Sequence, residues 1–218
     1  MIRPFIPPIL IFLAKKIRLL VIPDYELKKV KIDLINSQLF RGEENFYDDL
    51  NLSNITVYAE IGCGRSSVFL SQNYNCHIKC VDTSKEWLEL VRESLTEPNN
   101  VELVHVDLGN LKRWGRPESY VKAENIKTYA NSIFVGEKPD FILIDGRFRV
   151  FCFLTSLLNS EQNTIIIFDD YNNRPHYHIV EEIIKPVERR DRQAKFVVGE
   201  FDRLAAIKLL DKFEYVMD

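Results

Sequence analysis

The ten residues YAEIGCGRSS, at positions 58–67, constrain the fold of this chain more than any other stretch. An apolar run carries Glu60 near its end, and two glycines, Gly62 and Gly64, follow directly. Glycine is favoured where the backbone must turn tightly or come close to another group. The pattern predicts a buried β-strand, a tight turn, and a helix over the run SSVFLSQNY. A turn of this kind, between a strand and a helix, is shaped to hold a small molecule.

Apolar runs of strand length alternate with helical runs along the rest of the chain. The predicted strands are ITVYAEI, HIKCVD, VELVHVD, DFILID, TIIIFDD and, as a closing hairpin turning at Asp202 and Arg203, KFVVGEF and LAAIKLLDKF. Helices are predicted at 26–40, 66–74, 84–95, 150–159 and 178–188, and a polar connection at 109–138. This alternation predicts an α/β, Rossmann-like fold with a mostly parallel seven-stranded sheet, an antiparallel last strand and helices on both faces.

Acidic residues stand at the ends of the first five predicted strands. They are Glu60, Asp82, Asp107, Asp145 and the pair Asp169 and Asp170. One such residue alone is explained by a helix cap or a turn. Five consecutive strands that deliver carboxylates to the same edge of a sheet indicate a ligand site there, because ligands of open α/β sheets lie beyond the carboxyl ends of the strands.

The spacing around the glycine turn indicates which ligand this is. Asp82 lies 20 residues after Gly62, the spacing at which an acidic side chain binds ribose hydroxyls. A dinucleotide site also needs a third glycine, and Ser67 stands in its place. Glu60 would repel a pyrophosphate, but it suits a ligand with an ammonium or sulfonium group. The combination favours S-adenosylmethionine over a nicotinamide dinucleotide.

The motifs AEIGCGRSS, CVDTSKEW, VELVHVDLG and FILIDGRF, in this order, resemble those of class I S-adenosylmethionine-dependent methyltransferases. The resemblance covers roughly residues 50–210 and extends to the closing hairpin. It implies the following cofactor contacts: Glu60, Gly62 and Gly64 with the methionine part, Ser66 in the same turn, Asp82 with the ribose, and Asp107 with the adenine amine.

A narrower resemblance rests on HVDLGNLKRWGRP, LIDGRFRVFCFL and FDDYNNRPHYHIVEE. These runs look like a bacterial subgroup of uncharacterised methyltransferases that are suspected of acting on surface polysaccharides or other glycosylated products. The pair IDG and FDDY is also similar to macrocin-type sugar O-methyltransferases, whose corresponding carboxylates bind magnesium. The present sequence departs from that group at Arg147 and Phe148, where the group has Asp and His.

Methyl transfer to a sugar hydroxyl needs a group that takes the proton or a cation that stabilises the alkoxide. Asp145, Asp169 and Asp170 could hold Mg²⁺, which prefers oxygen ligands. Alternatively a general base acts alone, and Asp145, Asp170 and His178 are the candidates. His178 could instead be a helix-start residue that contacts only backbone or solvent.

Several further residues near these strand ends could contact an acceptor. Arg147, Arg149 and Arg174 suit an acceptor with a carboxylate or phosphate, or they neutralise the neighbouring aspartates. Tyr171 and Trp114 could form apolar faces for a sugar ring, or belong to a core or a lid. The segment 109–138 is predicted to shape the acceptor pocket and close over it.

Composition narrows the class of protein. The chain has 218 residues and a net charge of −3, with no polybasic stretch, which disfavours nucleic acid as a partner. The four cysteines fit neither a zinc site nor a disulfide scaffold and predict a cytoplasmic protein. Residues 1–23 are too short and too charged for a membrane span. They form either an amphipathic helix on the inner face of a membrane or a helix packed on the domain or on a second subunit.

These observations predict two parts, an N-terminal helical extension at 1–50 and an S-adenosylmethionine-binding methyltransferase domain at 51–218. The expected activity is O-methylation of a carbohydrate or other small-molecule acceptor. Three alternatives stay open: a nicotinamide-dependent oxidoreductase, a non-catalytic module attached to a membrane or partner through residues 1–23, and a methyltransferase that acts on a small molecule, a protein or a nitrogen acceptor.

Overall fold

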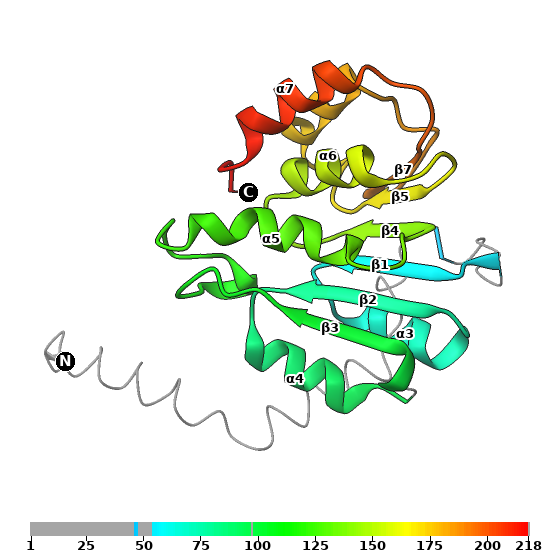
Figure 1. The fold of residues 1–218 in the computed structure, drawn as a ribbon, viewed down its shortest axis with the longest axis vertical. Coiled ribbons are helices and arrows are strands. Elements are labelled where there is room, and N and C mark those ends of the chain that lie inside the picture. The colour runs from blue at the N-terminus through cyan, green and yellow to red at the C-terminus, as the bar shows by residue number, and fades with distance from the viewer. Residues whose placement is uncertain (1–45, 48–53, 97, 218) are drawn as a thin grey trace, which may run out of the picture.

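The computed structural model describes residues 46–47, 54–96 and 98–217. A seven-stranded sheet runs through the middle of the molecule between two groups of helices (Figure 1). The strands are β1 (Val57–Ile61), β2 (His77–Asp82), β3 (Val101–His105), β4 (Phe141–Ile144), β5 (Ile165–Phe168), β6 (Glu188–Arg190) and β7 (Gln193–Val197). The α-helices are α3 (Arg65–Asn73), α4 (Lys85–Ser94), α5 (Ile126–Asn131), α6 (Arg149–Asn159) and α7 (Arg203–Phe213). Shorter 3-10 helices are η2 (Pro98–Asn100), η3 (Arg113–Gly115), η4 (Ala123–Asn125), η5 (Ser132–Phe134) and η6 (Pro175–Glu182).

The strand order is β3-β2-β1-β4-β5-β7-β6. Parallel ladders join β3 to β2, β2 to β1, β1 to β4 and β4 to β5. Strand β7 is antiparallel to both of its neighbours, β5 and β6. The predicted α/β fold with a mostly parallel sheet is therefore confirmed. The chain winds outward from β1 through β2 to β3 and then returns to the other side of β1 for β4, which creates the crevice where ligands bind in such sheets.

The two faces of the sheet carry separate cores, because successive side chains of a strand point to opposite sides. On one face, Tyr58 and Leu143 pack with apolar residues of α3 and α4. On the other face, Ile61 and Ile144 pack with residues of α5, α6 and α7 (Figure 1). The central strands are buried along their whole length, so their positions and those of their carboxyl ends are fixed by packing on both sides.

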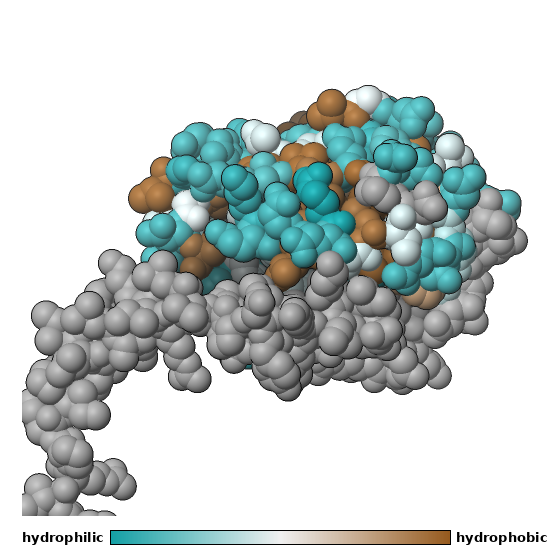
Figure 2. Space-filling view, turned by 90° about the horizontal axis from the view of Figure 1, so that it is seen from below, coloured by the Kyte–Doolittle hydropathy of each residue, from teal (hydrophilic) through white to brown (hydrophobic). Residues whose placement is uncertain are grey.

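The described surface is mixed in character. Figure 2 shows hydrophilic residues over most of the described part of one face, with apolar residues in small groups between them. Apolar residues scattered in this way are normal for a folded domain. Within the described residues, the helices are too short or too polar to span a membrane.

The prediction of a last strand at 204–213 is wrong, because this stretch forms α7. Its inward-facing apolar residues are Ala206, Leu209, Leu210 and Phe213, and spacings of three and four produce a stripe along a helix. Apolar residues are so frequent in LAAIKLLDKF that the run also has the composition of a strand. Only the spacing of the buried positions distinguishes a helix from a strand here.

The hairpin lies earlier in the chain than predicted. Strand β7 begins at Gln193 and pairs with β6 through a turn at Asp191, whose φ of +40° is in the left-handed region. The helix predicted at 178–188 is also displaced. The structure has the 3-10 helix η6 at Pro175–Glu182, and Pro186 then separates it from β6. Proline cannot continue a helix at that position because it lacks the N–H donor.

The predicted polar connection at 109–138 is not a simple loop. It contains α5, and Ile126, Tyr129 and Ala130 of that helix are buried in the core under α6. Only the first part, 110–118, crosses the mouth of the crevice. The predicted extension at 1–50 and the helix within 1–23 lie outside the described residues apart from 46–47, so their membrane or subunit contacts stay predictions.

The cap of α7 provides a test of the corrected C-terminal element. Asp202 accepts a hydrogen bond from the backbone N–H of Ala205 at 3.0 Å. We expect Asp202→Ala to lower the free energy of unfolding by about 1 kcal/mol, because an N-cap is lost. Urea denaturation measures the change. Asp211→Ala, at an exposed position of the same helix, is the control and should change the stability little. Equal effects of the two substitutions would contradict the assigned cap.

Candidate functional site

A cavity of about 880 Å³ opens at the carboxyl ends of β1, β2 and β4. Volumes of this size are typical of cofactor and small-molecule sites. Of the residues predicted from the sequence to form a site, Glu60, Gly62, Gly64, Ser66, Asp82, Asp145 and Asp170 line the cavity. Asp107, Asp169 and His178 are not among its lining residues.

Two glycines form the floor of the cavity. Gly62, with a φ of +93°, follows β1, and Gly146 follows β4. A Cβ atom on Gly62 would overlap the backbone of Gly146 and would lie 2.8 Å from the carbonyl carbon of Asp145. A Cβ atom on Gly146 would overlap the hydroxyl of Tyr129. Gly62 requires glycine because the two turns pack backbone against backbone, and Gly146 requires it because the buried Tyr129 side chain lies against it.

Glu60 is an almost completely buried carboxyl group, 1% exposed, at the inner wall of the cavity. The hydroxyls of Ser66 and Ser67 donate hydrogen bonds to it, the latter at 2.7 Å, and that of Tyr58 donates at 3.3 Å. Burial raises the pKa of Glu60 to about 7, although these hydrogen bonds act in the opposite direction. No cation of the described residues pairs with it, so a positively charged ligand would supply the missing counter-charge.

Asp82 lies at the end of β2 and lines the cavity beside the glycine turn, where the Cys63 thiol donates to its carboxylate at 4.0 Å. One carboxylate oxygen accepts the backbone N–H of Ser84 at 2.9 Å, which fixes the side chain. Burial raises the pKa of Asp82, and the N–H groups of Thr83 and Ser84 partly offset the effect. Trp87 supports the glycine turn by donating its indole N–H to the carbonyl of Cys63 at 2.7 Å. The arrangement leaves a positioned hydrogen-bond acceptor at the cavity wall.

Asp107 differs from the other strand-end carboxylates. Its carboxylate pairs with Lys122 and accepts the backbone N–H of Gly109 at 2.8 Å. The hydrogen bond from Lys122 lowers the pKa of Asp107. The side chain is about half exposed and lies outside the cavity lining. The adenine contact that the family resemblance implies for Asp107 stays a prediction.

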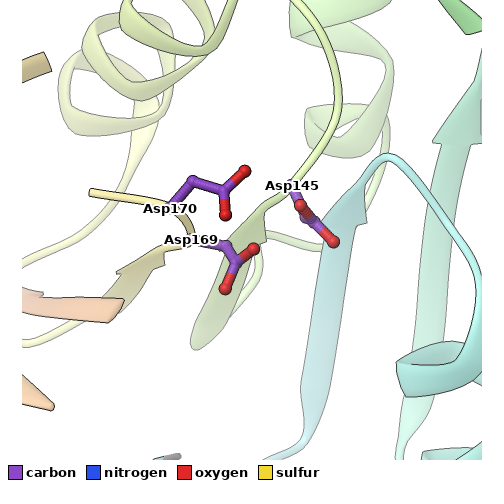
Figure 3. A group of neighbouring side chains, drawn as sticks. All are labelled: Asp145, Asp169 and Asp170. Atoms are coloured by element: carbon purple, nitrogen blue, oxygen red, sulfur yellow. The ribbon is translucent and has the colours of Figure 1, made fainter. Parts of the chain in front are cut away.

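The three remaining carboxylates gather at the ends of β4 and β5 (Figure 3). One carboxylate oxygen from each of Asp145, Asp169 and Asp170 lies within 4.8 Å of the others. Burial, followed by the charge of Asp169, raises the pKa of Asp145. Asp169 behaves in the opposite way. Burial alone would raise its pKa, but the hydrogen bond from Arg192 and the charges of Arg149 and Arg192 lower it.

Three arginines surround this group, which we call the aspartate trio. The Arg149 guanidinium lies 2.9 Å from an oxygen of Asp145 and 3.2 Å from one of Asp170. Arg192 pairs with Asp169 and lies 3.1 Å from Asp170, and Arg174 lies 2.8 Å from Asp170. These residues do not fit a magnesium site, because guanidinium groups already neutralise every carboxylate that would bind the ion.

The two histidines near the trio point elsewhere. The Nε2 atom of His178 lies 3.1 Å from the carbonyl oxygen of Tyr171, and its ring packs on the Tyr171 ring with centroids 4.7 Å apart. His176 packs against Tyr177. Tyr171 itself is fully buried, with its hydroxyl donating to Glu181 at 2.9 Å, so it belongs to the core rather than to a sugar-binding face. These placements favour an aspartate over His178 as a proton acceptor.

A small flap covers one side of the cavity. Residues 110–118 form it, closed by a β-bridge between Leu111 and Pro117. Trp114 at its tip has a φ of +66° and is 75% exposed, while also lining the cavity. Two hydrogen bonds hold the tip: Thr83 donates its hydroxyl to the carbonyl of Gly115 at 2.9 Å, and Arg147 donates to the carbonyl of Trp114 at 2.6 Å.

Sequence reasoning missed several lining residues, namely Arg65, Thr83, Ser84, Trp87, Lys112, Tyr129 and Arg192. Most of them are brought in by loops whose path depends on tertiary packing. Arg192 is one of four arginines and lysines in the run ERRDRQAK, and nothing in that run distinguishes it. The antiparallel pairing of β7 with β5 places it beside Asp169, and that pairing is a property of the fold.

Comparison with known structures identifies the class to which this fold belongs. A methyltransferase-like protein from Silicibacter pomeroyi superimposes with a TM-score of 0.65 at 24% identity, covering 89% of this chain and 95% of that one. An O-methyltransferase from Bacillus cereus in complex with SAH superimposes with a TM-score of 0.48 at 15% identity, covering 85% of this chain and 96% of that one. A putative O-methyltransferase from Klebsiella pneumoniae superimposes with a TM-score of 0.44 at 15% identity, covering 91% of this chain and 81% of that one.

No family model matches the sequence, and no curated protein matches it. The structural comparison with the Silicibacter pomeroyi protein nevertheless covers nearly all of both chains. The described domain therefore has the class I methyltransferase fold, with the Rossmann-like sheet predicted from the sequence.

The buried Glu60 predicts a measurable pH dependence of stability. Its pKa is raised from 4.5 to about 7 on folding, so the stability associated with the protonated group is present below pH 4.5 and is lost as the pH rises through 7. We expect Glu60→Gln to remove this loss, a relative change of roughly 3 kcal/mol. Urea denaturation from pH 5 to pH 8 measures it. The free energy of unfolding of the exposed variant Glu200→Gln should vary with pH as that of the unmodified protein does. If the free energy of unfolding of Glu60→Gln varied with pH in the same way, the assignment would be refuted.

Proposed function

We propose that this chain is an S-adenosylmethionine-dependent methyltransferase that methylates a hydroxyl group of a carbohydrate or glycosylated small molecule. The observation that carries the proposal is the pairing, across one cavity, of a buried carboxyl group without a cation, Glu60, and a positioned strand-end carboxylate, Asp82. Glu60 complements a positively charged group, and Asp82 suits a ribose diol. S-adenosylmethionine carries both groups.

The start of α3 supports this cofactor over a dinucleotide. In a dinucleotide site the helix N-terminus faces a pyrophosphate. Here the hydroxyl of Ser67 accepts the backbone N–H of Gly64 at 3.1 Å and donates to Glu60. The side chain that replaces the third glycine is thus engaged with a buried acid, and an anionic phosphate beside Glu60 would be repelled.

Asp145 is the group best placed to take the proton of the acceptor hydroxyl. It lines the cavity next to the glycine floor, and burial and the charge of Asp169 raise its pKa, which makes it a better proton acceptor. The bound cofactor would supply an electrophilic methyl group on a positively charged sulfur. In that transfer Asp145 would accept the proton that the acceptor hydroxyl gives up.

The flap supports an acceptor of the carbohydrate class. The exposed indole of Trp114 offers an aromatic face at the cavity mouth, and sugar rings pack on such faces. The Arg147 guanidinium, also at the cavity, donates to the backbone carbonyls of Gly146 and Trp114. Burial raises the pKa of Asp82 and the charge of Arg147 partly offsets this effect, but no carboxylate of the described residues lies within ion-pair distance of the guanidinium. An unpaired guanidinium suits a carboxylate or phosphate on the acceptor.

Calorimetric titration tests the cofactor. We expect S-adenosylmethionine to bind and NAD not to bind, and we expect Asp82→Asn to weaken the former at least about tenfold, since two hydroxyl hydrogen bonds are lost. Asp211→Asn on α7 is the matched control. Asp107→Asn should have little effect, because Asp107 lies outside the cavity lining. Absence of S-adenosylmethionine binding to the unmodified protein would refute the proposal and favour a non-catalytic module.

Acceptor screening tests the role of Arg147. Transfer of a radioactive methyl group to uronic-acid and neutral glycosides should favour the acidic ones in the unmodified protein. We expect Arg147→Gln to raise the KM for acidic acceptors about tenfold, as a charged hydrogen bond is lost, while the affinity for S-adenosylmethionine is unchanged. Arg92→Gln, on the exposed surface of α4 and away from the flap, is the control. Weaker cofactor binding in Arg147→Gln would instead assign this arginine to the cofactor carboxylate.

A further inference from the structure

The aspartate trio has the geometry of a cation site but not its charge. Three carboxylates with oxygens within 4.8 Å of one another at the wall of a cavity would suit a hard divalent cation. Three guanidinium groups lie against the same carboxylates, so the six side chains sum to zero formal charge. The question is whether the arginines are incidental neighbours or fixed parts of the site.

Arg149 is fixed from every side. It is the first residue of α6, and its side chain is only 4% exposed. Beyond its contacts with Asp145 and Asp170, its Nε donates to the carbonyl of Gly146 at 3.0 Å, and its terminal nitrogens donate to the carbonyls of Asp145 and Asp169 at 3.0 and 2.7 Å. All three nitrogens are thus used, and the guanidinium joins the ends of β4 and β5.

Arg192 and Arg174 complete the group from the other side. Arg192 uses two nitrogens on the two oxygens of Asp169, the paired geometry that makes arginine–carboxylate contacts strong. Gln193 donates to Asp169 as well, at 3.0 Å. Arg174 contacts Asp170 and also donates to the hydroxyl of Tyr177 at 2.8 Å. A divalent cation would have to displace these contacts while it is repelled by three nearby positive charges.

We propose that these three guanidinium groups take the place of a divalent cation at this site. They neutralise the aspartate trio and hold Asp145 and Asp170 in position at the cavity wall, so that the protein neither binds nor needs Mg²⁺ there. Arg149, Arg174 and Arg192 act on the reaction through the aspartates and are therefore positioning residues. The exclusion of Mg²⁺ does not depend on the proposed methyl transfer. The role of the arginines in turnover rests on that proposed function.

If the arginines exclude the cation, loss of an arginine should strengthen cation binding. In the unmodified protein the trio should bind Mn²⁺ and Mg²⁺ no better than scattered surface carboxylates do. Removing one guanidinium leaves the trio with a net negative charge and frees carboxylate oxygens. Arg192→Gln should therefore create cation binding that the unmodified protein lacks, an effect that simple loss of a structural contact would not produce.

The experiment is titration of the full chain with MnCl₂, followed by electron paramagnetic resonance of free Mn²⁺, and a thermal melt with and without MgCl₂. We expect no saturable site in the unmodified protein and at least about tenfold tighter Mn²⁺ binding in Arg192→Gln, with a melting temperature that now rises with MgCl₂. Arg174→Gln, whose side chain is 36% exposed, is the second variant if Arg192→Gln does not fold. Arg92→Gln, which loses only a surface pair with Glu89 on α4, is the matched control.

Two results would overturn the proposal. One is a saturable Mn²⁺ site in the unmodified protein that Asp170→Asn removes. The other is folded Arg192→Gln and Arg174→Gln proteins that bind Mn²⁺ no better than Arg92→Gln, since the guanidinium groups would then not be what excludes the cation. S-adenosylmethionine binding, measured in the same samples with and without EDTA, separates this outcome from failure of the proposed function.

Discussion

The close approach of two backbone turns determines the geometry of the whole site. Gly62 after β1 lies so near Gly146 after β4 that it has no room for a Cβ atom, and the Tyr129 hydroxyl excludes a Cβ atom at Gly146. Because β1 and β4 are adjacent parallel strands buried on both faces, the turns cannot separate without disturbing the sheet. This contact brings Glu60 and Asp145, each on its own strand end, to opposite sides of one floor.

The cavity is electrostatically divided around that floor. On the β1 side, Glu60 is held by hydroxyl groups alone, and burial keeps its pKa near neutrality until a cation arrives. On the β4 and β5 side, guanidinium groups have already neutralised the carboxylates, so that half is complete without a ligand. Under the proposed function, the positively charged cofactor would lie in the first half, and the acceptor would lie in the half that contains Arg147 and Asp145.

Most of the fold and half of the site could be predicted from the sequence, for a physical reason. The carboxylates at the strand ends are local features: each follows a buried apolar run directly, and parallel strands bring such ends to one edge. Arg192 could not be predicted in this way, because the antiparallel return of β7 beside β5 brings it to Asp169 from 23 residues away. The strand predicted at 204–213 failed because its composition suits both structures and only the spacing of buried residues distinguishes them.

The arginines around the aspartate trio bear on how the protein becomes functional in a cell. A protein that depends on a metal ion needs a loading step after folding, and its active fraction follows the supply of that ion. A guanidinium group is covalently part of the chain and keeps its charge at any physiological pH. With Arg149 at the start of α6 and Arg192 in the turn before β7, folding itself brings the positive charges to this site, so under the proposal no metal-loading step follows folding.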